Sequence, residues 1–437
     1  MCSLVKRGWA TGFSLLRRIS DLKSTRQCAD RKLIARMMMS TAVNSTPSSS
    51  SRVMSPPWLM LPPVFSEGGD MIYKFYNLSE DKEESFPKNR SNSEEEIADD
   101  DANFVGSSHG WLALFNKRNN HLFLYNPITS RHIKLPPIET LPDPSINLAP
   151  DGRGSVHKLI LSSSPDDDDE CIAMMIFGPE CRLAFCHPCH SIKWTPIGEL
   201  YDHDYVTYDG GMSPRCYQDI VYSSTRKLFF ARPSDGNLEC WDLSDSLSPR
   251  IHSSFQVLCP AFPHSVRNTN MVMVGARRKV NLVYAEEYNQ LFLVMQYVMD
   301  RLGPDSSYVH PIYYGKNRGW DNSFPYRTIY LNAVKADFGV EKPKVLRGSL
   351  DGLAMFVGLN HSIAMSPTPE SKLSSNCIYY TDSNENHIPE NAFYGGHDIG
   401  IFDYTKRKIS PCYDFPLDVK SIKRIMPAPM WFTPCHH

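Results

Sequence analysis

Short apolar runs separated by polar turns dominate the chain beyond residue 100, and residues 104–137 show this pattern most fully. In the stretch FVGSSHGWLALFNKRNNHLFLYNPITSRHIKLPP, two apolar runs, 111–115 and 122–125, are separated by a polar segment rich in Asn, and Asn126-Pro127 ends the second run. Apolar runs of this length, bounded by Gly, Asn and Pro, are typical of antiparallel hairpins. The stretch therefore predicts a β-meander of the kind that forms one blade of a propeller.

The same pattern returns along the rest of the chain. Residues 219–243 contain two hairpins in succession, and similar strand pairs are expected at 171–185, 280–295, 354–365 and 376–402. A recurrence of roughly 40 to 60 residues fits propeller blades, whereas almost no stretch beyond residue 100 keeps the 3.6-residue period of a helix. We therefore predict an all-β fold, a β-propeller of about six or seven mostly four-stranded blades. Two β-sandwiches are the alternative.

The first 40 residues have a different composition. They contain nine Lys and Arg residues against two Asp, and their apolar residues recur every three or four positions. An Arg-rich, acid-poor and amphipathic segment is typical of a mitochondrial presequence. The Ser-rich stretch 45–51 keeps a chloroplast transit peptide open, and a disordered basic tail is the third interpretation. We predict a cleavable presequence over 1–40, cut near 37–40, then a Ser/Pro-rich linker over 41–57 and the propeller domain over 58–437.

Charge and cysteine content narrow the range of partners. The formal net charge is −2, which gives no overall attraction for DNA or an acidic membrane surface. The 12 cysteines show no regular tight spacing, so we expect reduced thiols rather than a disulfide framework. No apolar run approaches the roughly 20 residues that a transmembrane helix needs, so membrane insertion is not expected.

One short motif could carry metal or haem chemistry. Cys186-His187-Pro188-Cys189-His190 has the C-x-x-C-H spacing of c-type haem attachment, in which His190 would be the axial ligand. Zinc bound by Cys186, Cys189 and His190, with Cys181 as a further ligand, is a second interpretation, although no second spaced pair is present. Because the motif lies between two expected strands, we favour a plain hairpin turn that contains proline, and we assign no metal or cofactor.

Other features give little reason to expect catalysis. The acidic runs 94–96, 99–101 and 166–170 lack metal-loop spacing and are interpreted as solvated loops rather than cation sites. No phosphate-binding loop, dinucleotide fingerprint or zinc-protease motif is present. His109, His361 and His397 are candidate bases by residue type only, and Arg277-Arg278-Lys279 is too small a basic patch to indicate RNA binding. We predict that the chain is not an enzyme.

Several motifs in order resemble the plant KIB-type β-propeller family, which is also defined as a domain of unknown function. They are Gly106-Ser107-Ser108-His109-Gly110-Trp111-Leu112, Asn126-Pro127 followed by Leu135-Pro136-Pro137, Phe356-Val357-Gly358 with Asn360-His361-Ser362, Asn376-Cys377-Ile378-Tyr379-Tyr380-Thr381-Asp382, and Asp398-Ile399-Gly400-Ile401-Phe402. The resemblance spans about residues 58 to 432. The basic N-terminus, the segment 57–63 and the segment 431–434 are similar to the organellar branch of that family.

The resemblance also implies two functions to compare. Many family members place an F-box before the propeller and act as substrate receptors of Skp1–cullin ubiquitin ligases. Here Trp58 to Pro63 resembles the opening of an F-box, but prolines, Gly68-Gly69 and acidic residues follow instead of the Leu-rich helical run that would grip Skp1. We therefore expect a non-enzymatic protein-interaction module in an organelle, the mitochondrion or alternatively the chloroplast, with an unknown protein partner. An F-box-like substrate receptor, and a metal- or haem-binding protein acting through Cys186–His190, are the alternatives.

Overall fold

The computed structural model describes most of the chain beyond residue 54. The described residues are 55–88, 102–116, 119–141, 156–198, 205–206, 212–213, 215–257, 259, 276–300, 326–337, 344–346, 348–383, 394–415 and 424–435. The chain divides into two units, one of residues 1–53 with 337–341 and one of residues 54–336 with 342–437. The account below concerns the second unit, and the predicted presequence lies outside the described residues.

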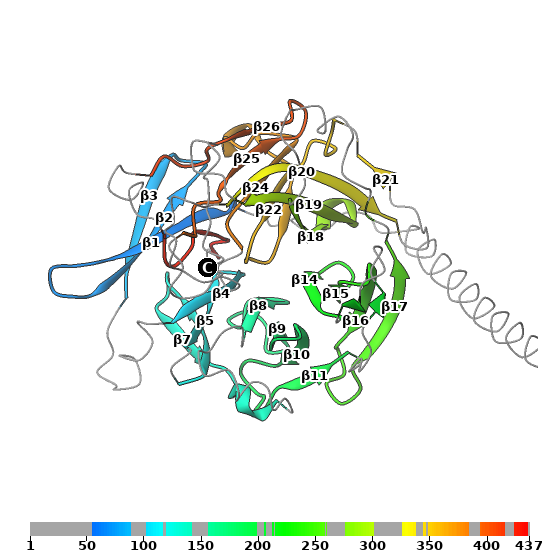
Figure 1. Cartoon of the computed structure of the whole chain (residues 1–437). Helices are drawn as coiled ribbons and strands as arrows, with labels where there is room; N and C mark the ends of the chain where they lie inside the picture. Colours follow the sequence, from blue (N-terminus) through cyan, green and yellow to red (C-terminus); the bar gives the residue numbers. More distant parts are fainter. Residues whose placement is uncertain are drawn as a thin grey trace, which may run out of the picture. The chain divides into compact units, whose positions relative to one another are not determined.

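Mostly antiparallel sheets build this unit, and each four-stranded sheet is one blade (Figure 1). Blade 1 contains β1 (Trp58–Phe65), β2 (Met71–Asn77), β3 (Lys82–Pro87) and the distant β27 (Met430–Phe432). Blade 2 contains β4 (Asn103–Ser108), β5 (Trp111–Asn116), β6 (His121–Asn126) and β7 (Arg131–Lys134). Blade 3 contains β8 (Val156–Leu161), β9 (Ala173–Phe177), β10 (Arg182–Cys186) and β11 (Thr195–Ile197). Blade 4 contains β14 (Tyr217–Ser223), β15 (Leu228–Pro233), β16 (Asn237–Asp242) and β17 (Arg250–Gln256).

The last two blades share one nine-stranded sheet. Blade 5 contains β18 (Arg277–Ala285), β19 (Gln290–Asp300), β20 (Tyr326–Ala336) and β21 (Lys344–Val345). Blade 6 contains β22 (Ala354–Val357), β23 (Ile363–Met365), β24 (Cys377–Tyr380), β25 (Gly400–Asp403) and β26 (Lys408–Ser410). A single parallel pairing, Tyr284 with Ile363, joins the two blades. A small hairpin of β12 (Tyr205–Val206) and β13 (Met212–Ser213) stands apart from the blades.

Neighbouring blades contact one another in order through their inner strands. The contacts run from β27 to β4, β8, β14, β18 and then β22, and Leu59 and Leu61 of β1 share a core cluster with Ala354 and Phe356 of blade 6. The described residues thus form six blades around a common axis, with no α-helix and only three short 3₁₀ turns at 138–140, 286–288 and 369–371. The predicted all-β propeller is confirmed. No helix in the described part of the chain has the length and apolar character needed to cross a membrane.

The position of each strand in the ring explains its sequence pattern. The segment WLALF in β5 is buried at every position, because neighbouring blades cover both faces of the sheet. In contrast, β2 alternates strictly between buried and half-buried positions. Continuous apolar runs therefore mark strands that lie between two blades.

Pairing between distant parts of the chain closes the ring. Trp58 pairs with Phe432, and Met60 pairs with Met430, so β1 and β27 lie in one sheet. Trp431 is fully buried and meets Phe356 of blade 6 edge-on, with ring centroids 5.1 Å apart. The segment Trp58–Pro63, which resembles the opening of an F-box, is therefore a strand in the blade core.

Blades 2 and 3 approach so closely at one point that only glycine fits. A Cβ on Gly106 of β4 would lie 1.9 Å from the carbonyl oxygen of Leu159 in β8. The pairing of β4 with β5 shifts between Phe104 and Gly106, which marks a bulge at this place. The inner strands here are packed backbone against backbone.

We predict that Gly106→Ala lowers the free energy of unfolding by at least about 2 kcal/mol, because the added methyl group forces two inner strands apart. The measurement is denaturant unfolding followed by tryptophan fluorescence. Gly68→Ala is the matched control, since its nearest atoms would lie at an ordinary 3.6 Å. Equal stability of the two variants would contradict the close packing at the axis.

Candidate functional site

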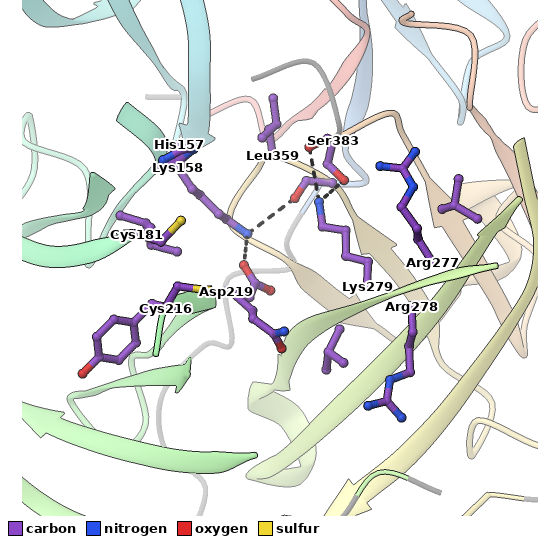
Figure 2. Close-up of a pocket in the computed structure, with 16 residues that line it drawn as sticks. His157, Lys158, Cys181, Cys216, Asp219, Arg277, Arg278, Lys279, Leu359 and Ser383 are labelled. Carbon is purple, nitrogen blue, oxygen red and sulfur yellow. Dashed lines mark hydrogen bonds and ion pairs between the residues drawn. The ribbon is translucent and has the colours of Figure 1, made fainter. Parts of the chain in front are cut away.

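A cavity of about 260 Å³ lies at the axis of the ring, where the inner strands of blades 3, 4 and 5 begin. Its walls come from the first residues of β8, β14 and β18, and from residues that follow β22 and β24 in blade 6 (Figure 2). Four blades therefore contribute to one pocket. This is the site that the fold positions most directly.

The turn between β22 and β23 closes the pocket on the side toward which the inner strands run. Gly358 and Leu359 line the cavity, and the backbone N–H of His361 donates to the carbonyl oxygen of Ser107 in blade 2 at 2.8 Å. The Nε2 atom of His361 lies 3.1 Å from the backbone of Tyr222 in blade 4. The turn thus reaches across the axis to inner strands on both sides of blade 3, and it forms the floor of the pocket.

A buried ion pair fixes one wall. Lys158 Nζ of β8 lies 2.6 Å from Asp219 Oδ1 of β14, and both side chains are less than a tenth exposed. The other oxygen of Asp219 accepts the backbone N–H of Leu282 in β18 at 2.6 Å, while Lys158 also donates to the carbonyl of Gly358 at 3.5 Å. The two charged groups and their backbone partners therefore come from four consecutive blades, 3 to 6.

The first three residues of β18 add more positive charge. Figure 2 shows Lys279 pointing toward Ser383. Arg277 leaves β18 on the same side as Lys279, and Arg278 leaves it on the opposite side. Lys279 Nζ donates to the backbone carbonyl and the hydroxyl of Ser383, and burial lowers the pKa of Lys279 to about 8. Arg277 pairs with Asp300 at 2.6 Å at the exposed rim.

Two cysteines meet on the opposite wall of the pocket. Cys181 lies in the turn after β9, Cys216 precedes β14, and the backbone N–H of Tyr217 donates to the carbonyl of Cys181 at 2.9 Å. A thiol–thiol hydrogen bond raises the pKa of Cys181 and lowers that of Cys216 to about 6. Cys216 therefore lines the same pocket as the cations of β18 and shares its proton with Cys181.

The structure separates the residues of the C-x-x-C-H motif. Cys186 ends β10 inside the core between blades 2 and 3, whereas Cys189 and His190 are exposed in the following turn. That turn is held by backbone donation from His190 and Ser191 to the carbonyl of His187. Cys181 lies before the start of β10, roughly 16 Å away along an extended strand. Within the described residues, no group of three or more His, Cys, Asp or Glu side chains is placed to hold a metal ion.

The three candidate histidines also have local roles. His109 and His361 face each other beneath the pocket with ring centroids 5.7 Å apart, and His397 stacks on Tyr394 at 4.9 Å. Burial lowers the pKa of His109 to about 4 and that of His361 to about 3, so both rings are neutral at physiological pH. The acidic run 166–170 contacts blade 2, because Asp166 pairs with Arg131 of β7. The runs 94–96 and 99–101 lie outside the described residues.

Sequence reasoning missed the pocket, although one signal was present. Lys158 stands in the otherwise apolar strand VHKLIL, and Asp219 stands in YQDIVY. A charged residue in the middle of an inner strand is costly unless it is paired. The sequence therefore indicates that each of these two charges needs a buried partner. Their separation of 61 positions does not reveal that they are partners of each other.

The fold and the axial pocket define a six-bladed β-propeller with a cavity lined by more cationic than anionic side chains. Residues 75–403 match the family model described as KIB1-4 beta-propeller. The chain therefore belongs to the KIB1-4 β-propeller family. No curated protein matches the chain.

Solved structures with a related shape are numerous, and 216 chains match. Apo AztD from Citrobacter koseri is 17% identical over 48% of this chain and 46% of its own, with a TM-score of 0.27. The Myceliophteria thermophila Cps50 (Swd1) β-propeller domain is 9% identical over 80% and 85%, with a TM-score of 0.33. A protein from Lactobacillus plantarum is 7% identical over 87% and 100%, with a TM-score of 0.38. The chain spans less than half the length of AztD. These TM-scores carry no argument about the ligands or partners of this chain.

We predict that the two buried histidines make stability fall with acid. Above pH 6.5 they are neutral in both the folded and the unfolded chain, and below it only the unfolded chain takes up protons until about pH 4. Each histidine should then cost up to about 1.4 kcal/mol per pH unit in this window. Unfolding of His361→Gln between pH 7 and 4.5 should show a weaker pH dependence than that of the unchanged chain.

The control for this experiment is His252→Gln, because His252 is exposed on β17. It should keep the pH dependence of the unchanged chain. Identical curves for His361→Gln and the unchanged chain would show that His361 is protonated without cost in the folded protein.

Proposed function

We propose that the chain is a non-enzymatic protein-interaction module whose binding face is the end of the ring that carries the axial pocket. The observation that supports this most directly is an exposed apolar hairpin tip between β1 and β2. Val64 is 40% exposed and Phe65 is 61% exposed at the end of β1. Exposed aromatic side chains on rigid supports are the usual anchors of protein interfaces.

The register of blade 1 places this tip at the pocket end. Gly110, which follows β4, would touch Cys435, which follows β27, so these two inner strands end on the same side. Met430 at the start of β27 pairs with Met60, and β1 continues past it to Phe65. The tip therefore projects from the side where the inner strands begin, which is the side of the pocket.

The tip is held rigidly by its own turn. The backbone N–H of Ser66 donates to Asp70 at 2.8 Å, Gly69 donates back to Ser66 at 2.9 Å, and the N–H of Asp70 donates to the Ser66 hydroxyl at 3.0 Å. A preformed turn loses little conformational entropy when a partner binds. This favours Phe65 as an anchor over an ordinary loop residue.

We predict that Phe65→Ser lowers recovery of the chain's protein partner at least tenfold when the tagged chain is purified from its native tissue and bound proteins are quantified by mass spectrometry. Leu247→Ser is the matched control, since Leu247 is 95% exposed in the turn between β16 and β17 at the opposite end of the ring. A set of captured proteins that is unchanged by Phe65→Ser, or equally changed by both variants, would contradict the proposed face.

The organelle address is a separate part of the proposal, supported by the basic, acid-poor composition of residues 1–40. A fluorescent fusion of the full chain should enter mitochondria, and a fusion that begins at residue 41 should not. The organelle-purified protein should begin near residues 37–41 on N-terminal sequencing. An intact Met1 in that protein would overturn the presequence, and import into chloroplasts would select the alternative address.

A further inference from the structure

The axial pocket carries more positive than negative charge. Lys158, Arg277, Arg278 and Lys279 line it, and Asp219 is the only carboxylate among its described lining residues. Asp219 already forms an ion pair with Lys158 and accepts the backbone N–H of Leu282. Arg277 pairs with Asp300 at the rim, which leaves Arg278 and Lys279 as lining cations without a carboxylate partner in the described part of the cavity wall.

Lys279 is the group at the centre of this imbalance. Among the described residues only Ser383 accepts hydrogen bonds from its ammonium group, which has three donors, and no carboxylate lies within ion-pair distance. Besides Asp219, two further carboxylates, Asp382 and Asp398, lie further off, and both have other partners. Asp382 accepts Tyr326 Oη at 2.6 Å and the N–H of Gly396 at 2.9 Å, and burial raises the pKa of Asp398 to about 7.

The size of the cavity limits what could balance this charge. Its volume of about 260 Å³ is just below the usual range for ligand pockets. A small anion fits in this space.

We propose that the axial pocket binds a small anion bearing phosphate or carboxylate groups, with Lys279 as its principal contact and Arg277 and Arg278 as flanking cations. Arg and Lys side chains bind both groups through charge-assisted hydrogen bonds, which are stronger where the site is partly desolvated. The floor made by Gly358 and Leu359 shields such an ion from the other end of the axis. This binding does not depend on a protein partner, so it can be tested independently of the proposed role of Phe65.

Isothermal titration calorimetry with inorganic phosphate and with citrate tests the proposal directly. The full chain should bind at least one of the two ions with one site per chain, and the stronger of them identifies the preferred group. Lys279→Gln should weaken this binding at least tenfold. Arg250→Gln, which removes a cation from the outer strand β17, is the matched control and should bind as the unchanged chain does.

The cysteines in and outside the pocket provide an independent readout. Cys216 lines the cavity, whereas Cys189 is exposed outside it. The ratio of alkylation by the anionic reagent iodoacetate to that by neutral iodoacetamide should be at least threefold higher at Cys216 than at Cys189, and it should fall with added salt and in Lys279→Gln. Bound phosphate or citrate should protect Cys216 and leave Cys189 unchanged, as peptide-level mass spectrometry would show.

Two outcomes would overturn the inference. One is the absence of a calorimetric signal for both ions in the folded, unchanged chain. The other is a binding signal that Lys279→Gln and Arg250→Gln reduce equally, because that would indicate nonspecific attraction to surface charge. Binding that survives Phe65→Ser supports the pocket even if the proposed protein interface fails.

Discussion

The ion pair between Lys158 and Asp219 connects four consecutive blades. It links β8 to β14 directly, β14 to β18 through the N–H of Leu282, and β8 to blade 6 through the carbonyl of Gly358. Desolvating two charges costs several kcal/mol per ion, so such a pair is weak evidence for extra stability. Its effect here is on geometry, since it fixes the positions of neighbouring inner strands relative to one another along the axis of the ring. The axial pocket exists because those strands begin at a common level.

The two ends of the axis differ in chemistry for the same reason. The turn at residues 358–362 fills the axis below the ion pair with neutral groups, including the facing rings of His109 and His361. Above the ion pair, the first residues of β18 bring cations to the opening. A chain built from similar blades thereby acquires one closed end and one charged, open end. The pocket follows from this polarity, and the interaction face that we propose lies at the same end.

The sequence predicted the strands far better than the site. Continuous apolar runs such as 111–115 are caused by burial on both faces, and burial is a local property that a sequence records directly. The pocket depends on Lys158, Asp219 and Lys279, which lie on three different strands and meet only because the ring fixes their register. The prominent local motif, Cys186–His190, turned out to be divided between core and surface. Proximity along the chain was therefore a poor guide to chemistry, and it gave no sign that Cys181 would meet Cys216.

The pairing of β1 with β27 has a consequence for how the chain is made. Residues 58–60 leave the ribosome before their partners at 430–432 are made, because all the intervening blades are synthesised between them. At about 5–20 residues per second, β1 therefore presents an unpaired, apolar edge for on the order of 20 to 75 seconds. During that time the edge can pair with other chains, so nascent protein needs a chaperone or dilute conditions. Once β27 arrives, it covers this edge of β1, and the edge that remains is the short strand β27 beside the axis of the ring.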